Sequence, residues 1–185
     1  MEADCISYAK KCQIYADKIH SSPSSLHTMN SPWPFAMWVM DAIGQIHPTA
    51  SNRHRFILVA IDYFTKWVEA TSYPNITRAT ICKFIKKEII CRYGLSERIV
   101  TDNASNLNNK MITEVCKQFR ITHHNSTTYR PKMNGAVEAA NKNIKKIIAK
   151  KTETFRDCHE KLPFALFAYR TPVRTSTGAT PYSLV

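Results

Sequence analysis

Apolar residues in the first half of the chain gather in three short runs, at 38–46, 56–62 and 67–72. Their lengths and the short polar segments between them predict three antiparallel strands joined by tight connections. The run at 56–62 is apolar almost throughout, which is typical of a central strand buried on both faces. We therefore expect a three-stranded meander in this part of the fold.

Helical spacing replaces this pattern further along the chain. Four large apolar residues fall on one side of a possible helix: Ile81, Phe84, Ile85 and Ile89. Thr77 is a suitable N-cap and Gly94 a suitable residue just past the C-terminal end. The pattern therefore predicts a helix over 78–93.

Strands and helices alternate in the second half of the chain. Short strands are predicted at 97–101 and 121–125, and helices at about 109–120, 135–152 and 159–170. A meander followed by alternating strands and helices indicates an α/β fold, with a mixed five-stranded sheet flanked by helices.

The N-terminal part differs in composition. Residues 21–35 carry three prolines and five serines, which predicts a linker after a short, partly helical lead at 1–20. We therefore expect two regions, an N-terminal segment at 1–35 and a compact domain at 36–185.

The net charge of the chain predicts a class of binding partner. The 185 residues include 26 basic and 14 acidic side chains, for a net charge of +12 and a pI near 9.6. This excess favours a polyanionic partner, with nucleic acid as the first candidate, and a merely basic soluble protein is the alternative. With only 4 glycines, the chain lacks the Gly-rich loops that cradle nucleotide phosphates.

The sequence shows no secretion signal and no paired cysteines, which indicates an intracellular protein. No run approaches the ~18 apolar residues of a membrane span, and the N-terminus lacks the features of a signal peptide. We expect an intracellular protein that uses no membrane. The six cysteines form no CxxC pair, so zinc is not expected, and Cys82, Cys91 and Cys116 are interpreted as small core residues of helices.

Three acidic residues stand in apolar surroundings: Asp41, Asp102 and Glu138. A carboxylate in such a place is costly unless a cation, hydrogen bonds or a proton compensates it. Each acid has an ordinary explanation on its own, as an edge-strand residue, a cap or a first-turn residue. Most of the other acids lie in polar sequence, and we expect them to be solvated.

The spacing of these acids suggests that they meet. Asp102 and Glu138 are separated by 35 residues, which is room for one helix, one strand and a loop. If the strand ending in Asp102 lies beside the strand containing Asp41, with the long helix packed across their ends, the three carboxylates converge. Such a cluster ionises fully only around a cation. Hard oxygen ligands select Mg²⁺ or Mn²⁺, and two such ions suit an in-line displacement at phosphorus. Asp62, which ends another strand, stays open as the alternative first ligand.

Basic residues follow Glu138 on its own face of the predicted helix. Asn141, Lys142 and Lys145 lie three, four and seven positions after it. This placement favours contacts with DNA phosphates beside the acids, although an ordinary solvated lysine face is the alternative. Asn103 and Tyr129 are further candidates for positioning DNA.

Five segments resemble the integrase of gypsy-class LTR retrotransposons, of the kind abundant in plant genomes: WVMDAIG, FILVAIDYFTKWVEA, IVTDNASNLNN, YRPKMNGAVEAANKNIKKI and LPFALFAYRTPVRTSTGATPYSLV. The resemblance covers nearly the whole chain and implies an RNase H-like fold. It implies a D,D-35-E triad at Asp41, Asp102 and Glu138 that binds two divalent metal ions, and it leaves Asp62 out. It also implies DNA 3′-end processing and strand transfer into a target duplex by a homo-oligomer, in the nucleus or, before import, in the cytoplasm.

The N-terminal segment departs from this family. CISYAKKCQIYADKIH resembles the tail of a zinc module that precedes the family's core, with Cys12 in place of its final cysteine. Ala9 stands where the partner cysteine is expected, and the chain begins too late for the two upstream histidines. One ligand in four does not hold Zn²⁺ tightly, so we expect residues 1–35 to be a remnant of this module without zinc.

Two alternative functions share the same fold. One is a decayed retroelement fragment that binds nucleic acid without catalysis, and the intact triad argues against it. The other is an RNase H-type nuclease, which the integrase-like segments argue against. Fold alone does not separate these functions, so the site must decide.

Overall fold

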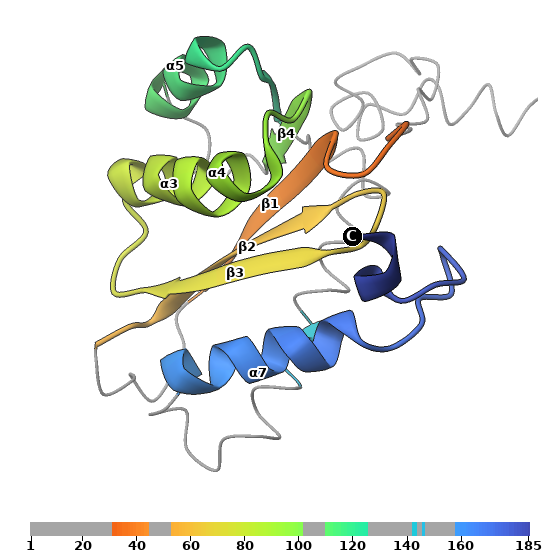
Figure 1. Ribbon diagram of the computed structural model, residues 1–185. Coiled ribbons are helices and arrows are strands. Elements are labelled where there is room, and N and C mark those ends of the chain that lie inside the picture. The colour runs from red at the N-terminus through yellow and green to blue at the C-terminus, as the bar shows by residue number, and fades with distance from the viewer. Residues whose placement is uncertain (1–30, 45–52, 102–109, 126–141, 144–145, 147–157) are drawn as a thin grey trace, which may run out of the picture. The chain divides into compact units, whose positions relative to one another are not determined.

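Five strands form one mixed sheet in the computed structural model, which describes residues 31–44, 53–101, 110–125, 142–143, 146 and 158–185 (Figure 1). The strands are β1 (Met37–Ile43), β2 (Phe56–Asp62), β3 (Val68–Tyr73), β4 (Arg98–Thr101) and β5 (Thr122–Asn125). All described residues belong to one compact unit, Ser31–Val185.

The strand order is β3-β2-β1-β4-β5. β1 pairs antiparallel with β2, and β2 pairs antiparallel with β3, which confirms the predicted meander. β4 runs parallel to β1, and β5 runs parallel to β4. The strand predicted at 56–62 is buried on both faces as expected, but β1 rather than β2 takes the centre of the sheet.

The first predicted helix is present and has three parts: α3 (Arg78–Phe84), a π-helical segment η1 (Ile85–Ile90) and α4 (Cys91–Tyr93). Thr77 caps its start, because the Thr77 side chain accepts from the backbone N–H of Thr80 and the Thr80 side chain accepts from the N–H of Thr77. Gly94, at φ 85°, follows its end in a conformation that glycine adopts without strain.

Three further helices lie within the described residues: α5 (Lys110–Gln118), α7 (Cys158–Arg170) and the short 3₁₀ helix η3 (Pro181–Leu184). The first two confirm the helices predicted at 109–120 and 159–170. Of the helix predicted at 135–152, residues 142, 143 and 146 are helical, and the other positions lie outside the described residues.

The sheet carries helices on both faces. Trp38, Met40 and Leu58 pack with α3, η1 and α5 in one core cluster. Figure 1 shows α7 across the sheet from α3, and α7 buries a second apolar set: Leu162, Ala165, Leu166 and Tyr169. Because side chains alternate along a strand, each position of β1 and β2 can be assigned to one of these two faces.

Two expectations from the sequence are wrong. Cys91 is exposed, whereas Cys82 and Cys116 are buried as predicted. Glu69, one of the acids expected to be solvated, is only 3% exposed, because two arginines and two aromatic side chains surround its carboxylate. Charge compensation from distant parts of the chain makes this burial possible.

Candidate active site

Asp41 lies near the carboxyl end of the central strand. Its side chain is half-buried, and one carboxylate oxygen, Oδ1, accepts the backbone N–H of Ala42 at 2.7 Å. Trp38 and Met40 belong to the cluster under α3 and α5, so the alternation of β1 directs Asp41 to the opposite face, the one that α7 partly covers.

The three parallel strands place their carboxyl ends at one edge of the sheet. Met40 pairs with Thr101, which in turn pairs with Asn125. Asp41 therefore comes one residue after the last described rung between β1 and β4. Asp102 comes next after Thr101 in the sequence and lies outside the described residues. Ligands of open α/β sheets bind at such carboxyl edges.

Asp62 has a structural role. It is fully buried at the end of β2 and pairs with Trp38, so it lies on the face opposite to Asp41. Its Oδ1 accepts the N–H of Phe35 at 3.1 Å. Its Oδ2 accepts the N–H and the hydroxyl of Thr65 at 2.8 and 2.7 Å. These bonds fix the turn between β2 and β3.

Burial and hydrogen bonding act on Asp62 in opposite directions. Desolvation raises the pKa of the Asp62 carboxyl, and the donors of Thr65 and Phe35 oppose that rise. Burial also acts on the neighbouring Lys66, where it lowers the pKa of the ammonium group. The negative charge of Asp62 opposes this decrease. Donors from the following turn and from Phe35 thus compensate the buried carboxylate of Asp62.

A polar chain at the ends of β4 and β5 is the feature that sequence analysis missed. The hydroxyl of the buried Thr101 lies 2.9 Å from Nε2 of His123 and 3.2 Å from Oδ1 of Asn125. Burial and the neighbouring His124 lower the pKa of His123. The polar string THHN in a predicted strand was the available signal for this cluster.

The other predicted site residues divide by whether the structure describes them. Lys142 is helical and exposed, as a phosphate contact requires. The remaining candidates lie outside the described residues: Asp102, Asn103, Tyr129, Glu138, Asn141 and Lys145. Within the described part of the chain, no group of three or more His, Cys, Asp or Glu side chains is arranged to hold a metal ion.

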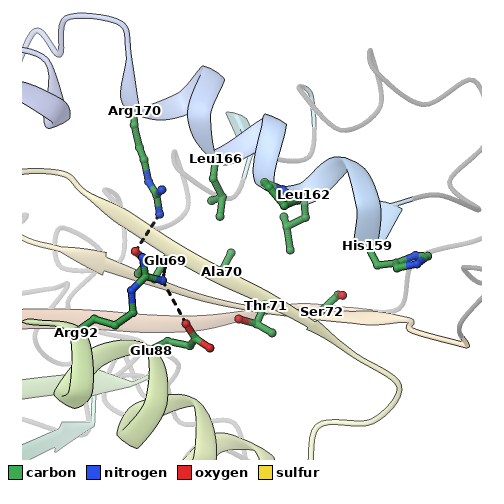
Figure 2. A pocket seen from close by; sticks show the side chains of 11 residues that line it. Glu69, Ala70, Thr71, Ser72, Glu88, Arg92, His159, Leu162, Leu166 and Arg170 are labelled. Carbon is green, nitrogen blue, oxygen red and sulfur yellow. Dashed lines mark hydrogen bonds and ion pairs between the residues drawn. The ribbon is translucent and has the colours of Figure 1, made fainter.

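A groove of about 340 Å³ runs along the outer edge of β3, between α7 and the helix of η1 and α4 (Figure 2). Arg170 points from α7 to Glu69, with Nη2 3.0 Å from Oε1, and Arg92 lies between Glu69 and Glu88. Asp41 does not line this groove. The charged residues that line the groove pair with one another, and these ion pairs hold α7 and α4 against the edge strand β3.

A comparison with known protein families identifies the class of this domain. Residues 32–131 match the family described as the integrase core domain. The chain belongs to this family. The resemblance seen in the sequence is therefore confirmed at the level of the family, and the assignment to a gypsy-class element of plant type stays a prediction.

Relatives of this integrase core occur in viral and transposon polyproteins. The Gag-Pol polyprotein of Avian reticuloendotheliosis virus is 32% identical over 154 residues, which are 82% of this chain and 13% of the polyprotein. The retrovirus-related Pol polyprotein from transposon 412 of Drosophila melanogaster is 25% identical over 183 residues, or 96% of this chain and 15% of that one. The chain thus spans only a small part of these relatives.

Two solved structures confirm the RNase H-like fold of integrase cores. A chain of the simian T-cell lymphotropic virus intasome in complex with PP2A regulatory subunit B56 gamma gives a TM-score of 0.72 at 22% identity, covering 100% of this chain and 66% of that one. The catalytic core domain of BIV integrase gives 0.63 at 26% identity, covering 80% and 91%. In the described part of this integrase core, no helix is long and apolar enough to cross a membrane.

Proposed function

We propose that this integrase core catalyses metal-dependent 3′-end processing of retroelement DNA and strand transfer into a target duplex. The observation that carries the proposal is the placement of Asp41. This half-buried carboxylate lies at the carboxyl end of the central strand, beside the strand whose last described residue, Thr101, directly precedes Asp102. Membership of the integrase core family supports the same reaction class.

The chemistry of Asp41 fits a divalent ion. A carboxylate is a hard oxygen donor, and Asp41 keeps part of its surface open, whereas Asp62 is sealed within its turn. Asp41, Asp102 and Glu138 would hold two Mg²⁺ or Mn²⁺ ions. When bound, these ions supply activation of a water or a DNA 3′-hydroxyl and stabilisation of the leaving oxygen.

The remaining contribution of the chain is to position DNA. The net charge of +12 attracts the phosphate backbone, and the exposed Lys142 offers a contact on the helix that follows Glu138 in the sequence. We assign a positioning role beside it to Asn103, Tyr129, Asn141 and Lys145. Phosphate contacts fix the position of the protein along the DNA, whereas contacts with the bases determine which sequence is bound.

The partners and boundaries proposed here follow from the same family assignment. The core acts at residues 36–185 as a homo-oligomer on DNA in the nucleus, and residues 1–35 resemble the tail of a zinc-binding module followed by a Pro/Ser-rich linker. Light scattering of the purified chain, with and without a DNA duplex, measures the oligomeric state.

The reaction itself is tested with a labelled retroelement-type DNA end and a target duplex in Mn²⁺. The wild-type chain is compared with Asp102→Asn and Glu138→Gln. Nicked or joined products from the wild type alone support the proposal, and full activity of Glu138→Gln contradicts the assignment of that ligand. Tight, salt-sensitive DNA binding without product supports a catalytically inactive fragment, and cleavage confined to an RNA–DNA hybrid supports an RNase H-type nuclease.

A further inference from the structure

The polar chain of Thr101, His123 and Asn125 crosses from β4 to β5 on a single face of the sheet. Thr101 pairs directly with Asn125, and His123 lies two residues earlier on the same strand. Alternation therefore directs all three side chains to the α5 side. Thr101 is fully buried, and its hydroxyl is the shared member of both hydrogen bonds.

The direction of these hydrogen bonds follows from the number of protons. The Thr101 hydroxyl carries one proton, and it donates this proton to the carbonyl oxygen Oδ1 of Asn125. The same hydroxyl must then accept from Nε2–H of His123. Hydrogen bonds that share one hydroxyl in this way strengthen one another.

These hydrogen bonds lie next to the proposed metal ligands. Thr101 is the last described residue of β4, and its rung to Met40 directly precedes Asp41. Metal-binding carboxylates need to be held within roughly 0.5 Å of their working positions by supporting contacts. The hydrogen bonds between the Thr101 hydroxyl and two residues of β5 restrict the movement of β4 at this edge of the sheet.

We propose that the Thr101–His123–Asn125 chain is a positioning device for the metal site, which fixes the carboxyl end of β4 beside Asp41. The inference rests on the proposed function, because Asp102, the residue after Thr101, is the second proposed ligand. None of the three side chains is catalytic. Their neutral hydrogen bonds act through the backbone that carries the ligands, as supporting contacts of metal sites do.

The test measures Mn²⁺ binding directly, by electron paramagnetic resonance on the full chain without DNA. Thr101→Val removes the hydroxyl and keeps the shape of the side chain, and Thr101→Ser restores the hydroxyl. We expect Thr101→Val to weaken Mn²⁺ binding by about 10- to 100-fold, the usual effect of losing a supporting contact. Thr101→Ser should return the dissociation constant to near the wild-type value.

A merely structural role gives a different result. If Thr101→Val lowers the melting temperature but leaves the Mn²⁺ dissociation constant unchanged, the positioning role is overturned. If Thr101→Val does not fold, the pair His123→Leu and His123→Gln takes its place, because glutamine retains a side-chain donor and leucine does not. Weakened Mn²⁺ binding in His123→Leu, with recovery in His123→Gln, supports the inference, and equal binding in both overturns it.

The same measurement separates this inference from the proposed function. If the wild-type chain binds no Mn²⁺, or binds it as well as Asp41→Asn does, the metal site itself is wrong. If the wild type binds Mn²⁺ in an Asp41-dependent manner and the Thr101 and His123 variants match it, only the positioning inference fails.

Discussion

Asp41 and Asp62 lie on opposite faces of the sheet, although their strands are neighbours. Asp41 pairs with Val59, and Asp62 pairs with Trp38, which lies three positions before Asp41 on β1. An odd number of positions places two side chains on opposite faces of a sheet. Asp62 is enclosed by donors from its own turn, and Asp41 remains half-open. Two acids that each lie in an apolar strand therefore have different surroundings, and we assign the metal-binding role to Asp41 alone.

The turn held by Asp62 should be essential for stability. Asp62→Ala leaves the N–H groups of Phe35 and Thr65 and the Thr65 hydroxyl without their acceptor. We expect a loss of about 2–5 kcal/mol in the free energy of unfolding, measured by urea denaturation. Thr65→Ser, which keeps the hydroxyl, is the matched control. A loss below that of a typical surface substitution would contradict the structural role.

The Glu69 network should hold α7 to the sheet. Arg170 donates from Nε and Nη2 to the carbonyl of Val68 at 3.1 and 2.6 Å, and its guanidinium stacks 4.0 Å from the ring of Trp67. Glu69→Gln leaves Arg170 and Arg92 without their buried counter-charge.

We therefore expect Glu69→Gln to lower the free energy of unfolding by about 3–5 kcal/mol, the usual result of breaking a buried ion pair. Glu88→Gln is the control, because Glu88 is less deeply buried than Glu69 and its partner Arg92 is 48% exposed, so its loss should cost less than about 1 kcal/mol. Equal losses in the two variants would show that burial of Glu69 has no special importance.

Thiol reactivity should distinguish the buried cysteines from the exposed one. Burial, with a smaller contribution from Cys82, raises the pKa of the Cys116 thiol to about 11. Burial also raises the pKa of Cys82, although Lys86 opposes the rise. Only the thiolate reacts with iodoacetamide, so at pH 8 Cys116 should be labelled roughly 100-fold more slowly than the exposed Cys91. Peptide mapping by mass spectrometry reads each site, and equal rates would place Cys116 at the surface.

Lys142 and Lys145 should contribute to DNA affinity through phosphate contacts. Replacing both with glutamate should weaken binding to any duplex and reduce the salt slope of the binding constant by about 2. Lys87→Glu, on an exposed position of η1, is a control for net charge alone. A slope that stays at the wild-type value in the Lys142 and Lys145 variant would indicate an ordinary solvated lysine face.

Local patterns predicted the elements of this fold well. The strand at Phe56–Asp62 was predicted with its observed ends, because a continuous apolar run bounded by polar residues has few other interpretations. Thr77 and Gly94 marked the ends of the first helix. The π-helical segment Ile85–Ile90 within it was not predicted, since apolar spacing does not reveal which carbonyl each N–H selects.

Side-chain environments set by distant partners were harder to predict. Cys91 lies two residues from the buried Ile89, so it falls on the other side of the helix, and its presence in a helical pattern did not decide its burial. Glu69 depends on Arg170, more than a hundred residues away in the chain, and no local pattern shows that pairing. Asp41 was predicted correctly as a residue set in an apolar strand, and its half-open position is visible only in the assembled sheet.

The most direct test of the account compares Asp41→Asn with Asp62→Asn in the Mn²⁺-dependent DNA nicking and joining assay. Both variants remove one negative charge from neighbouring strands, and melting temperatures record any loss of folding. We predict that Asp41→Asn lowers product formation by about 100-fold or more while the chain stays folded, since it loses a metal ligand. Asp62→Asn should retain its response to Mn²⁺ even where its stability falls. Equal activity in the Asp41→Asn variant and the wild type would contradict the assignment of the active site.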